Sequence, residues 1–116
     1  MSLFSTHDPD EALAHLTPQD IEAICCFYQG RSSRVGALND LAHTVETELL
    51  HSIVAPTLVI HSREDKSVPF QHAEWSLAHI PNSRLCESGL TGHFYWVGPD
   101  DQRVSQELVS FLRSTL

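Results

Sequence analysis

The 116-residue sequence contains no run of about 18 apolar residues and no basic start followed by an apolar segment. We therefore expect the sequence to contain no membrane span and no signal peptide. Basic residues are also few, because 7 Lys and Arg face 15 Asp and Glu, and they form no cluster. The net charge of −8, with histidine neutral, therefore argues against nucleic acid and anionic membrane as partners.

Cysteine is scarce and odd in number, which disfavours a disulfide framework. The sequence has Cys25, Cys26 and Cys86 but no C-x-x-C pair. We expect a reducing, cytoplasmic location, with Cys86 buried as a small apolar residue and Cys25 and Cys26 packing on their helix.

Zinc-site spacings are missing as well. Neither H-E-x-x-H nor C-x-x-C occurs, although the sequence has 8 histidines. His72 and His79 share one side of an expected helix, but they lie seven residues apart. We therefore expect no metal and no cofactor.

The length indicates a single domain over residues 1–116, with 1–33 as a helical N-terminal segment of uncertain role. A 13.0 kDa chain is expected to expose about 6,300 Å² when folded, against about 18,900 Å² when unfolded. With 41% hydrophobic residues, such a chain has enough apolar surface for a core. It is too short for a TIM barrel, which needs about 250 residues.

Capping residues and apolar spacing predict three helices in the first half. Asp8 and Pro9 form a typical helix start, and Thr17-Pro18-Gln19-Asp20 repeats the signal. The expected helices cover about residues 8–16, 17–30 and 35–50, with a loop at 30–33.

The second half reads as strand, helix, strand, helix. Thr57–Ile60 is a β-branched apolar run typical of a strand buried on both faces, and Arg84–Glu87 alternates like a half-exposed edge strand. A helix between Pro69 and Pro81 separates them. The last helix begins at Asp100 or Asp101, and its expected buried face consists of Val104, Leu108, Phe111 and Leu112. The predicted fold class is α/β, with N-terminal helices followed by β-α-β-α and a parallel strand pair.

Two candidate site residues follow the two strands. Asp65 lies just past the first strand, and His93 lies in the loop past the second. The carboxyl ends of parallel strands meet at one sheet edge, so we expect Asp65 and His93 to touch. A carboxylate on one imidazole nitrogen fixes the tautomer and leaves the other nitrogen as a base. The aromatic residues after His93, which are Phe94, Tyr95 and Trp96, either line a pocket or pack the loop.

These segments resemble a known family. The stretch Ile53-x-x-Pro56-Thr57-Leu58-Val59-Ile60-His61-x-x-x-Asp65-x-x-Val68-Pro69 resembles the acid-bearing segment of α/β-hydrolases. Ile80-Pro81-Asn82-Ser83-Arg84-Leu85, followed by Gly92-His93-Phe94, resembles their last strand and histidine loop. The resemblance covers about residues 34–116, including Arg34-Val35-Gly36 and Asn39-Asp40. It implies that Asp65 is the acid and His93 the base of a catalytic triad.

The nucleophile of that family is absent. Its serine lies upstream of the acid on a G-x-S-x-G elbow. No G-x-S-x-G occurs here, since Gly30-Arg31-Ser32-Ser33-Arg34 ends in arginine, and Ser88 and Thr91 do not lie on a strand-to-helix elbow. The resemblance is therefore to the C-terminal portion of an α/β-hydrolase. It implies a protein that is inactive alone and hydrolyses a small ester-like substrate only with a serine supplied in trans.

Two alternatives stay open. One is a non-catalytic homodimeric scaffold that serves interaction or ligand binding, and the other is a fragment of a longer hydrolase. The open edge of the Thr57–Ile60 strand favours pairing with another chain. We expect either a homodimer through this edge or a missing N-terminal half as the partner, besides a small-molecule substrate.

Overall fold

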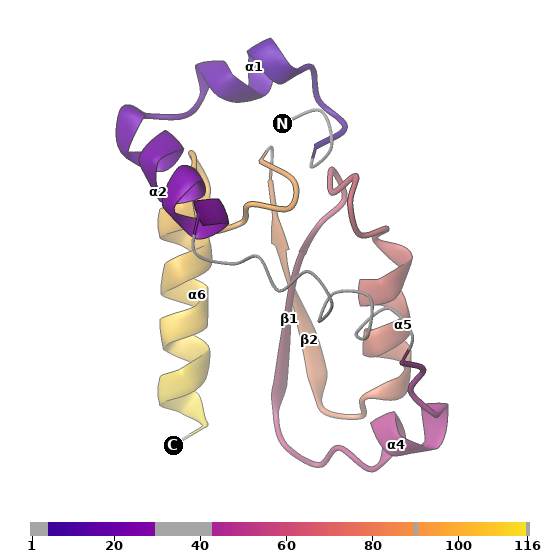
Figure 1. Cartoon of the computed structure of the whole chain (residues 1–116). Coiled ribbons are helices and arrows are strands. Elements are labelled where there is room, and N and C mark those ends of the chain that lie inside the picture. The colour runs from indigo at the N-terminus through magenta and orange to yellow at the C-terminus, as the bar shows by residue number, and fades with distance from the viewer. Residues whose placement is uncertain (1–4, 30–42, 90, 116) are drawn as a thin grey trace.

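A computed structural model describes residues 5–29, 43–89 and 91–115 and shows an α/β unit. Figure 1 shows the strand pair flanked by helices, with further helices at the N-terminal end. In chain order the elements are α1 (Pro9–Ala14), α2 (Pro18–Gln29), α4 (Thr47–His51), β1 (Thr57–Ser62), α5 (Gln71–His79), β2 (Ser83–Ser88) and α6 (Asp101–Ser114). No helix in the described ranges is both long and apolar enough to cross a bilayer.

The two strands form the expected parallel pair. Thr57 lies opposite Ser83, and the register continues to Ser62 opposite Ser88. Each strand is slightly longer than predicted. The expectation that β1 is buried on both faces is wrong, because residues 57–61 are only half-buried. Among the described residues no third strand pairs with the other edge of β1.

The helices α5 and α6 lie on opposite sides of the strand pair (Figure 1). The core between them contains Ala73 of α5, Cys86 of β2 and Val104 of α6, all buried. This confirms the prediction for Cys86. The face predicted for α6 is only partly buried, since Leu108 and Leu112 are 37% and 51% exposed. A pair of strands is too narrow to cover the second half of the helix.

The first two helices begin where their capping residues predict. The Asp10 N–H donates to Asp8 Oδ1 at 2.9 Å at the start of α1. At α2 the Asp20 N–H donates to Thr17 Oγ1 at 3.2 Å, and the Thr17 N–H donates to Asp20 Oδ2 at 2.8 Å. These bonds satisfy backbone donors that the first helical turn leaves free.

The packing predicted for two cysteines on α2 is wrong. Cys25 and Cys26 are both exposed. The helix meets the loop after β2 through Phe27 and Tyr28, whose rings lie 5.1 and 6.0 Å from those of Trp96 and Phe94. This contact leaves the cysteine side chains on the open surface.

The helix predicted for residues 35–50 is only partly confirmed in its described part. Residues 43–46 are not helical, and α4 spans only Thr47–His51 after an extended Glu46. Val45 and Leu49 are 56% and 60% exposed. An apolar spacing stabilises a helix only where its face packs, and here that face has no cover within the described residues. Residues 30–42, including the predicted loop at 30–33, lie outside the described residues.

Much apolar surface stays exposed to solvent. The accessible surface is 8,040 Å², well above the expected value of about 6,300 Å². Val54 is 89% exposed, and Ile21 and Tyr28 of α2 are 44% and 47% exposed. The chain therefore buries less than a compact domain of its length.

Candidate functional site

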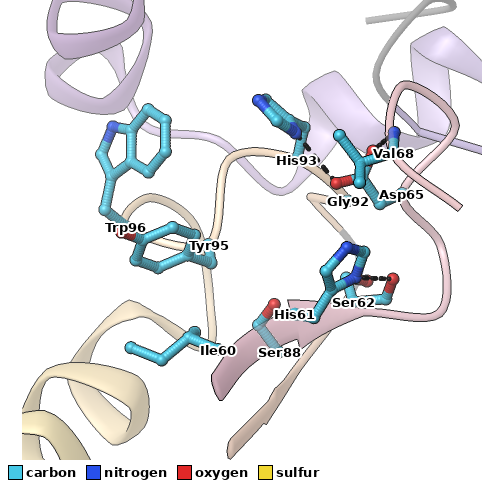
Figure 2. Close-up of a pocket in the computed structure, with 10 residues that line it drawn as sticks. All are labelled: Ile60, His61, Ser62, Asp65, Val68, Ser88, Gly92, His93, Tyr95 and Trp96. Carbon is cyan, nitrogen blue, oxygen red and sulfur yellow. Dashed lines mark hydrogen bonds and ion pairs between the residues drawn. The ribbon is translucent and has the colours of Figure 1, made fainter. Parts of the chain in front are cut away.

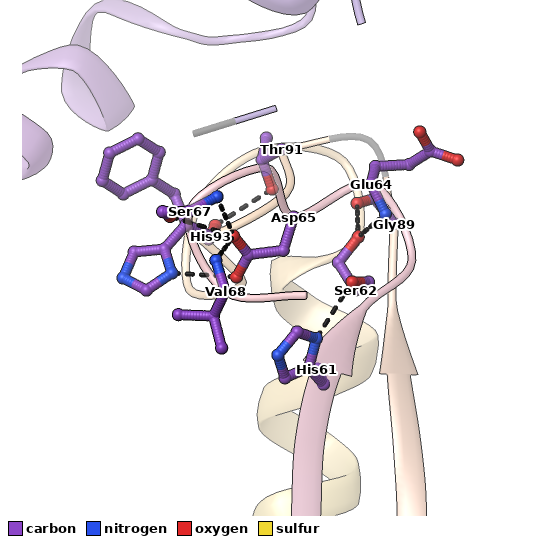
Figure 3. Close-up of polar contacts among 10 residues, drawn as sticks. His61, Ser62, Glu64, Asp65, Ser67, Val68, Gly89, Thr91 and His93 are labelled. Carbon is purple, nitrogen blue, oxygen red and sulfur yellow. Dashed lines mark hydrogen bonds and ion pairs between the residues drawn. The ribbon is translucent and has the colours of Figure 1, made fainter. Parts of the chain in front are cut away.

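Asp65 and His93 meet at the carboxyl ends of β1 and β2, as the sequence predicts. His93 Nδ1 lies 2.9 Å from Asp65 Oδ2, although the residues are 28 positions apart (Figure 3). The strands end in register at Ser62 and Ser88, so the two following loops start side by side. The parallel pairing therefore explains the contact.

The Asp65 carboxylate is held by its own loop. Asp65 Oδ1 accepts hydrogen bonds from the Ser67 N–H at 2.8 Å, the Ser67 hydroxyl at 2.9 Å and the Val68 N–H at 2.9 Å. Asp65 as a whole is only 9% exposed to solvent. This turn points Oδ2 at His93 and leaves Asp65 little freedom to rotate.

The hydrogen bonds keep Asp65 ionised. Burial alone would raise the pKa of its carboxyl group. Bonds from the Val68 N–H, His93 and Ser67 outweigh that effect and hold the pKa of Asp65 below its usual range. Asp65 is thus a carboxylate at neutral pH and can accept a hydrogen bond from the Nδ1–H of His93.

A left-handed turn and two buried side chains position His93. Gly92 has φ +61°, a conformation that favours glycine. The buried Thr91 hydroxyl, which faces the carbonyl oxygens of Phe94 and Val97 at 3.0 and 3.2 Å, ties the loop together. The Phe94 side chain is 1% exposed and anchors the loop. The aromatic residues after His93 were expected either to line a pocket or to pack the loop. Phe94 therefore packs the loop.

Close contacts also fix the start of the histidine loop. The Ser62 hydroxyl donates to the Gly89 carbonyl oxygen at 2.9 Å and accepts from the Glu64 N–H at 3.0 Å. A Cβ on Gly89 would lie 1.8 Å from Asp100 Oδ2, so only glycine fits without movement of Asp100. These contacts connect the two loops that carry Asp65 and His93.

A pocket opens beside this pair, with a volume of about 170 Å³ (Figure 2). Pockets for drug-sized ligands span about 300–1,000 Å³, so this one suits a smaller molecule. Tyr95 and Trp96 line it, which is the other role considered for the aromatic run. The remaining lining residues are Ile60, His61, Ser62, Asp65, Val68, Ser88, Gly92 and His93.

The hydroxyl groups near the pair differ in their bonding. The hydroxyls of Ser67 and Thr91 are engaged with Asp65 and with backbone carbonyls. Ser88 is buried, and its Oγ has no hydrogen-bond partner within the described residues. Ser32 and Ser33 belong to the stretch that most resembles the G-x-S-x-G motif. They lie outside the described residues. The sequence led us to consider Ser88 only as a replacement nucleophile. Its position two residues after buried Cys86 places it on the same strand face, which could have predicted its burial.

The histidines considered for a metal do not gather. His72 and Trp75 lie on the outer face of α5, and the His79 ring is 5.4 Å from that of His51. His79 Nδ1 lies 2.7 Å from the Trp75 carbonyl oxygen. In residues 5–29, 43–89 and 91–115 no group of three or more His, Cys, Asp or Glu side chains could hold a metal ion.

Comparison with known proteins points to hydrolases. The chain is 31% identical over 113 residues to the uncharacterized hydrolase YcgS of Bacillus subtilis, covering 96% of this chain and 40% of that protein. It is 30% identical over 106 residues to the putative carbamate hydrolase RutD of Serratia proteamaculans, covering 91% of this chain and 36% of that protein. No family model and no solved structure matches. The chain is thus similar to hydrolases over nearly all its length and spans about two fifths of theirs.

Proposed function

We propose that this chain supplies the acid and base of an α/β-hydrolase-type site and corresponds to the C-terminal portion of that fold. The observation that carries the proposal is the 2.9 Å bond between Asp65 and His93 at the carboxyl edge of two parallel strands. The similarity to proteins named as hydrolases supports it. The substrate class is a small ester-like molecule.

The chemistry follows from the proton positions. Ionised Asp65 accepts a hydrogen bond from the Nδ1–H of His93, which keeps the proton on Nδ1 and leaves Nε2 as the base. Nε2 removes the proton of a serine hydroxyl as that oxygen bonds to the substrate carbonyl carbon. His93 then gives this proton to the leaving alcohol as the carbon–oxygen bond breaks. The acyl-serine is then hydrolysed. His93 Nε2 takes a proton from water as the water oxygen attacks the acyl carbon, and this proton passes to the serine oxygen as the acyl group leaves.

The serine comes from another polypeptide segment in this proposal. The sequence has no G-x-S-x-G, and the hydroxyls of Ser67 and Thr91 are engaged elsewhere. The half-buried β1, whose outer edge lacks a neighbour within the described residues, offers a place for that segment to pair. The segment belongs either to a second copy of this chain or to a polypeptide equivalent to the N-terminal half of a hydrolase.

A fluorophosphonate probe, which reacts with activated serines, tests the function. Tagged chain is recovered from its cells under native conditions with whatever polypeptides it binds, and the complex is then labelled. We expect an adduct that His93→Ala abolishes and the exposed-site control His72→Ala retains. Absence of any adduct, or an adduct that His93→Ala leaves unchanged, would contradict the proposal and favour a non-catalytic scaffold.

A further inference from the structure

The floor of the pocket holds a buried hydroxyl that the proposed chemistry does not use. Ser88 is 4% exposed, and its Oγ finds no hydrogen-bond partner in the described part of the chain. Ser62 lies opposite Ser88 in the strand register, and its hydroxyl both donates and accepts. A buried hydroxyl without a partner is unfavourable, because it loses its bonds to water and gains none. A ligand that bonds to Ser88 removes this penalty.

A second polar group lines the same pocket. His61 Nδ1 is 2.9 Å from the Ser62 carbonyl oxygen, which can only accept, so Nδ1 carries a proton. In the neutral ring Nε2 is then a hydrogen-bond acceptor. Figure 2 shows that both residues come from the strand ends, with the Tyr95 and Trp96 rings across the pocket. The floor therefore combines a donor with an acceptor.

The surroundings select against an anion. No Lys or Arg occurs among the described lining residues, and the pocket contains the Asp65 carboxylate. A negatively charged ligand would meet this carboxylate without a compensating cation. The Tyr95 and Trp96 rings, 5.0 Å apart edge to face, make the opposite wall aromatic. A flat, uncharged molecule can stack on the face of one of these rings.

We propose that Ser88 and His61 recognise an uncharged amide-type group on a small planar ligand. The Ser88 hydroxyl donates to the ligand carbonyl oxygen, and His61 Nε2 accepts from the neighbouring N–H. This inference rests on the proposed function in that the ligand is the substrate or product held beside His93. It adds the chemical group by which the site recognises that ligand and the two residues that position it.

Binding of benzamide to the purified chain tests the proposal without requiring turnover. Backbone amide shifts are followed by two-dimensional NMR during titration with benzamide and, separately, with benzoate, which has the same ring but carries a negative charge. We expect saturable shifts at residues around the pocket with benzamide and much weaker ones with benzoate. Benzoate binding as tightly as benzamide would overturn the proposal.

Variants separate the two floor residues from the rest. Ser88→Ala should weaken benzamide binding about tenfold, as expected for loss of a hydrogen bond in a buried site. His61→Phe keeps a ring beside Phe70 but removes the acceptor, so a similar loss is expected. Ser105→Ala, at an exposed position on α6, is the matched control and should bind like the wild type. Equal affinity of wild type and Ser88→Ala would overturn the proposal.

His93→Ala distinguishes this proposal from the hydrolase function. The variant should lose probe labelling but still bind benzamide more tightly than benzoate, since Ser88, His61 and the Asp65 carboxylate stay in place. Benzamide binding without any labelling would contradict the hydrolase function alone. Probe labelling of the native complex without any benzamide binding to the purified chain would contradict the ligand site alone.

Discussion

Asp65 uses its two carboxylate oxygens for different neighbours, and only Oδ2 lies against His93. Oδ1 accepts the bonds of the turn formed by Ser67 and Val68. The residue therefore joins a local structure, which forms from adjacent residues, to a contact that requires the parallel strand pair. This division makes the effects of substitutions at Asp65 separable.

Asp65→Asn should invert the tautomer of His93 at a modest cost in stability. The amide oxygen can still accept from the Ser67 and Val68 N–H groups, while the amide nitrogen faces His93 and can only donate. Nδ1 must then lose its proton, which moves to Nε2, and the free energy of unfolding should fall by about 1–2 kcal/mol. Imidazole nitrogen shifts measured by NMR report the tautomer. The control is Asp8→Asn at an exposed cap, and an unchanged His93 tautomer in Asp65→Asn would contradict the assigned bond.

Stability should fall in acid because the pKa of Asp65 is lowered in the folded chain. The folded pKa lies below the unfolded value of about 3.9, so the stabilisation is fully present above that value. It is lost as pH decreases through the folded pKa, because protonated Asp65 no longer accepts all of its bonds. Hydrogen bonds from Thr17 also lower the pKa of Asp20, which adds a smaller, exposed contribution of the same sign.

Urea unfolding at pH 6 and at about pH 3 measures this dependence. The wild type should lose more stability across the interval than Asp65→Asn, which has no carboxyl group at this position. Asp20→Asn serves as the control for the helix cap and should keep the larger part of the pH dependence. An identical acid sensitivity of wild type and Asp65→Asn would refute the linkage.

Gly92 should tolerate asparagine better than alanine. Its φ of +61° lies in the left-handed region, where a Cβ costs about 1–2 kcal/mol and asparagine is less disfavoured than other residues. Gly92→Ala should therefore destabilise the chain more than Gly92→Asn, as measured by chemical denaturation. Equal losses for both variants would show that space, rather than backbone conformation, restricts this position.

The free edge of β1 can be blocked without breaking the strand pair. The Thr57 N–H donates to the Asn82 carbonyl oxygen at 2.8 Å, so alternation along the strand directs the Leu58 N–H away from β2. If copies pair through this edge, the wild type sediments as a dimer at micromolar concentration, and Leu58→Pro removes the dimer.

Val59→Pro is the matched control for that experiment. The Val59 N–H faces β2 by the same alternation, so its loss should unfold the strand pair rather than only separate the copies. Circular dichroism distinguishes the two effects. A wild type that is strictly monomeric at these concentrations would contradict pairing between copies of this chain.

Local chemistry made several elements predictable. Asp8, Thr17 and Asp20 bond to backbone N–H groups within three residues, so the helix starts follow from adjacent residues alone. The prediction for residues 35–50 failed at 43–46 because apolar spacing cannot show whether a surface exists to receive Val45 and Leu49.

The sequence by itself determined the types of element, their order and the two residues that follow the strands. Those properties depend on capping, on β-branched runs and on the residue types at strand ends, which act over a few positions. The tertiary structure alone decided that β1 is half-buried, that Cys25 is exposed and that Ser88 lies buried without a partner among the described residues. Burial depends on which distant segment covers a face, and no local pattern contains that information.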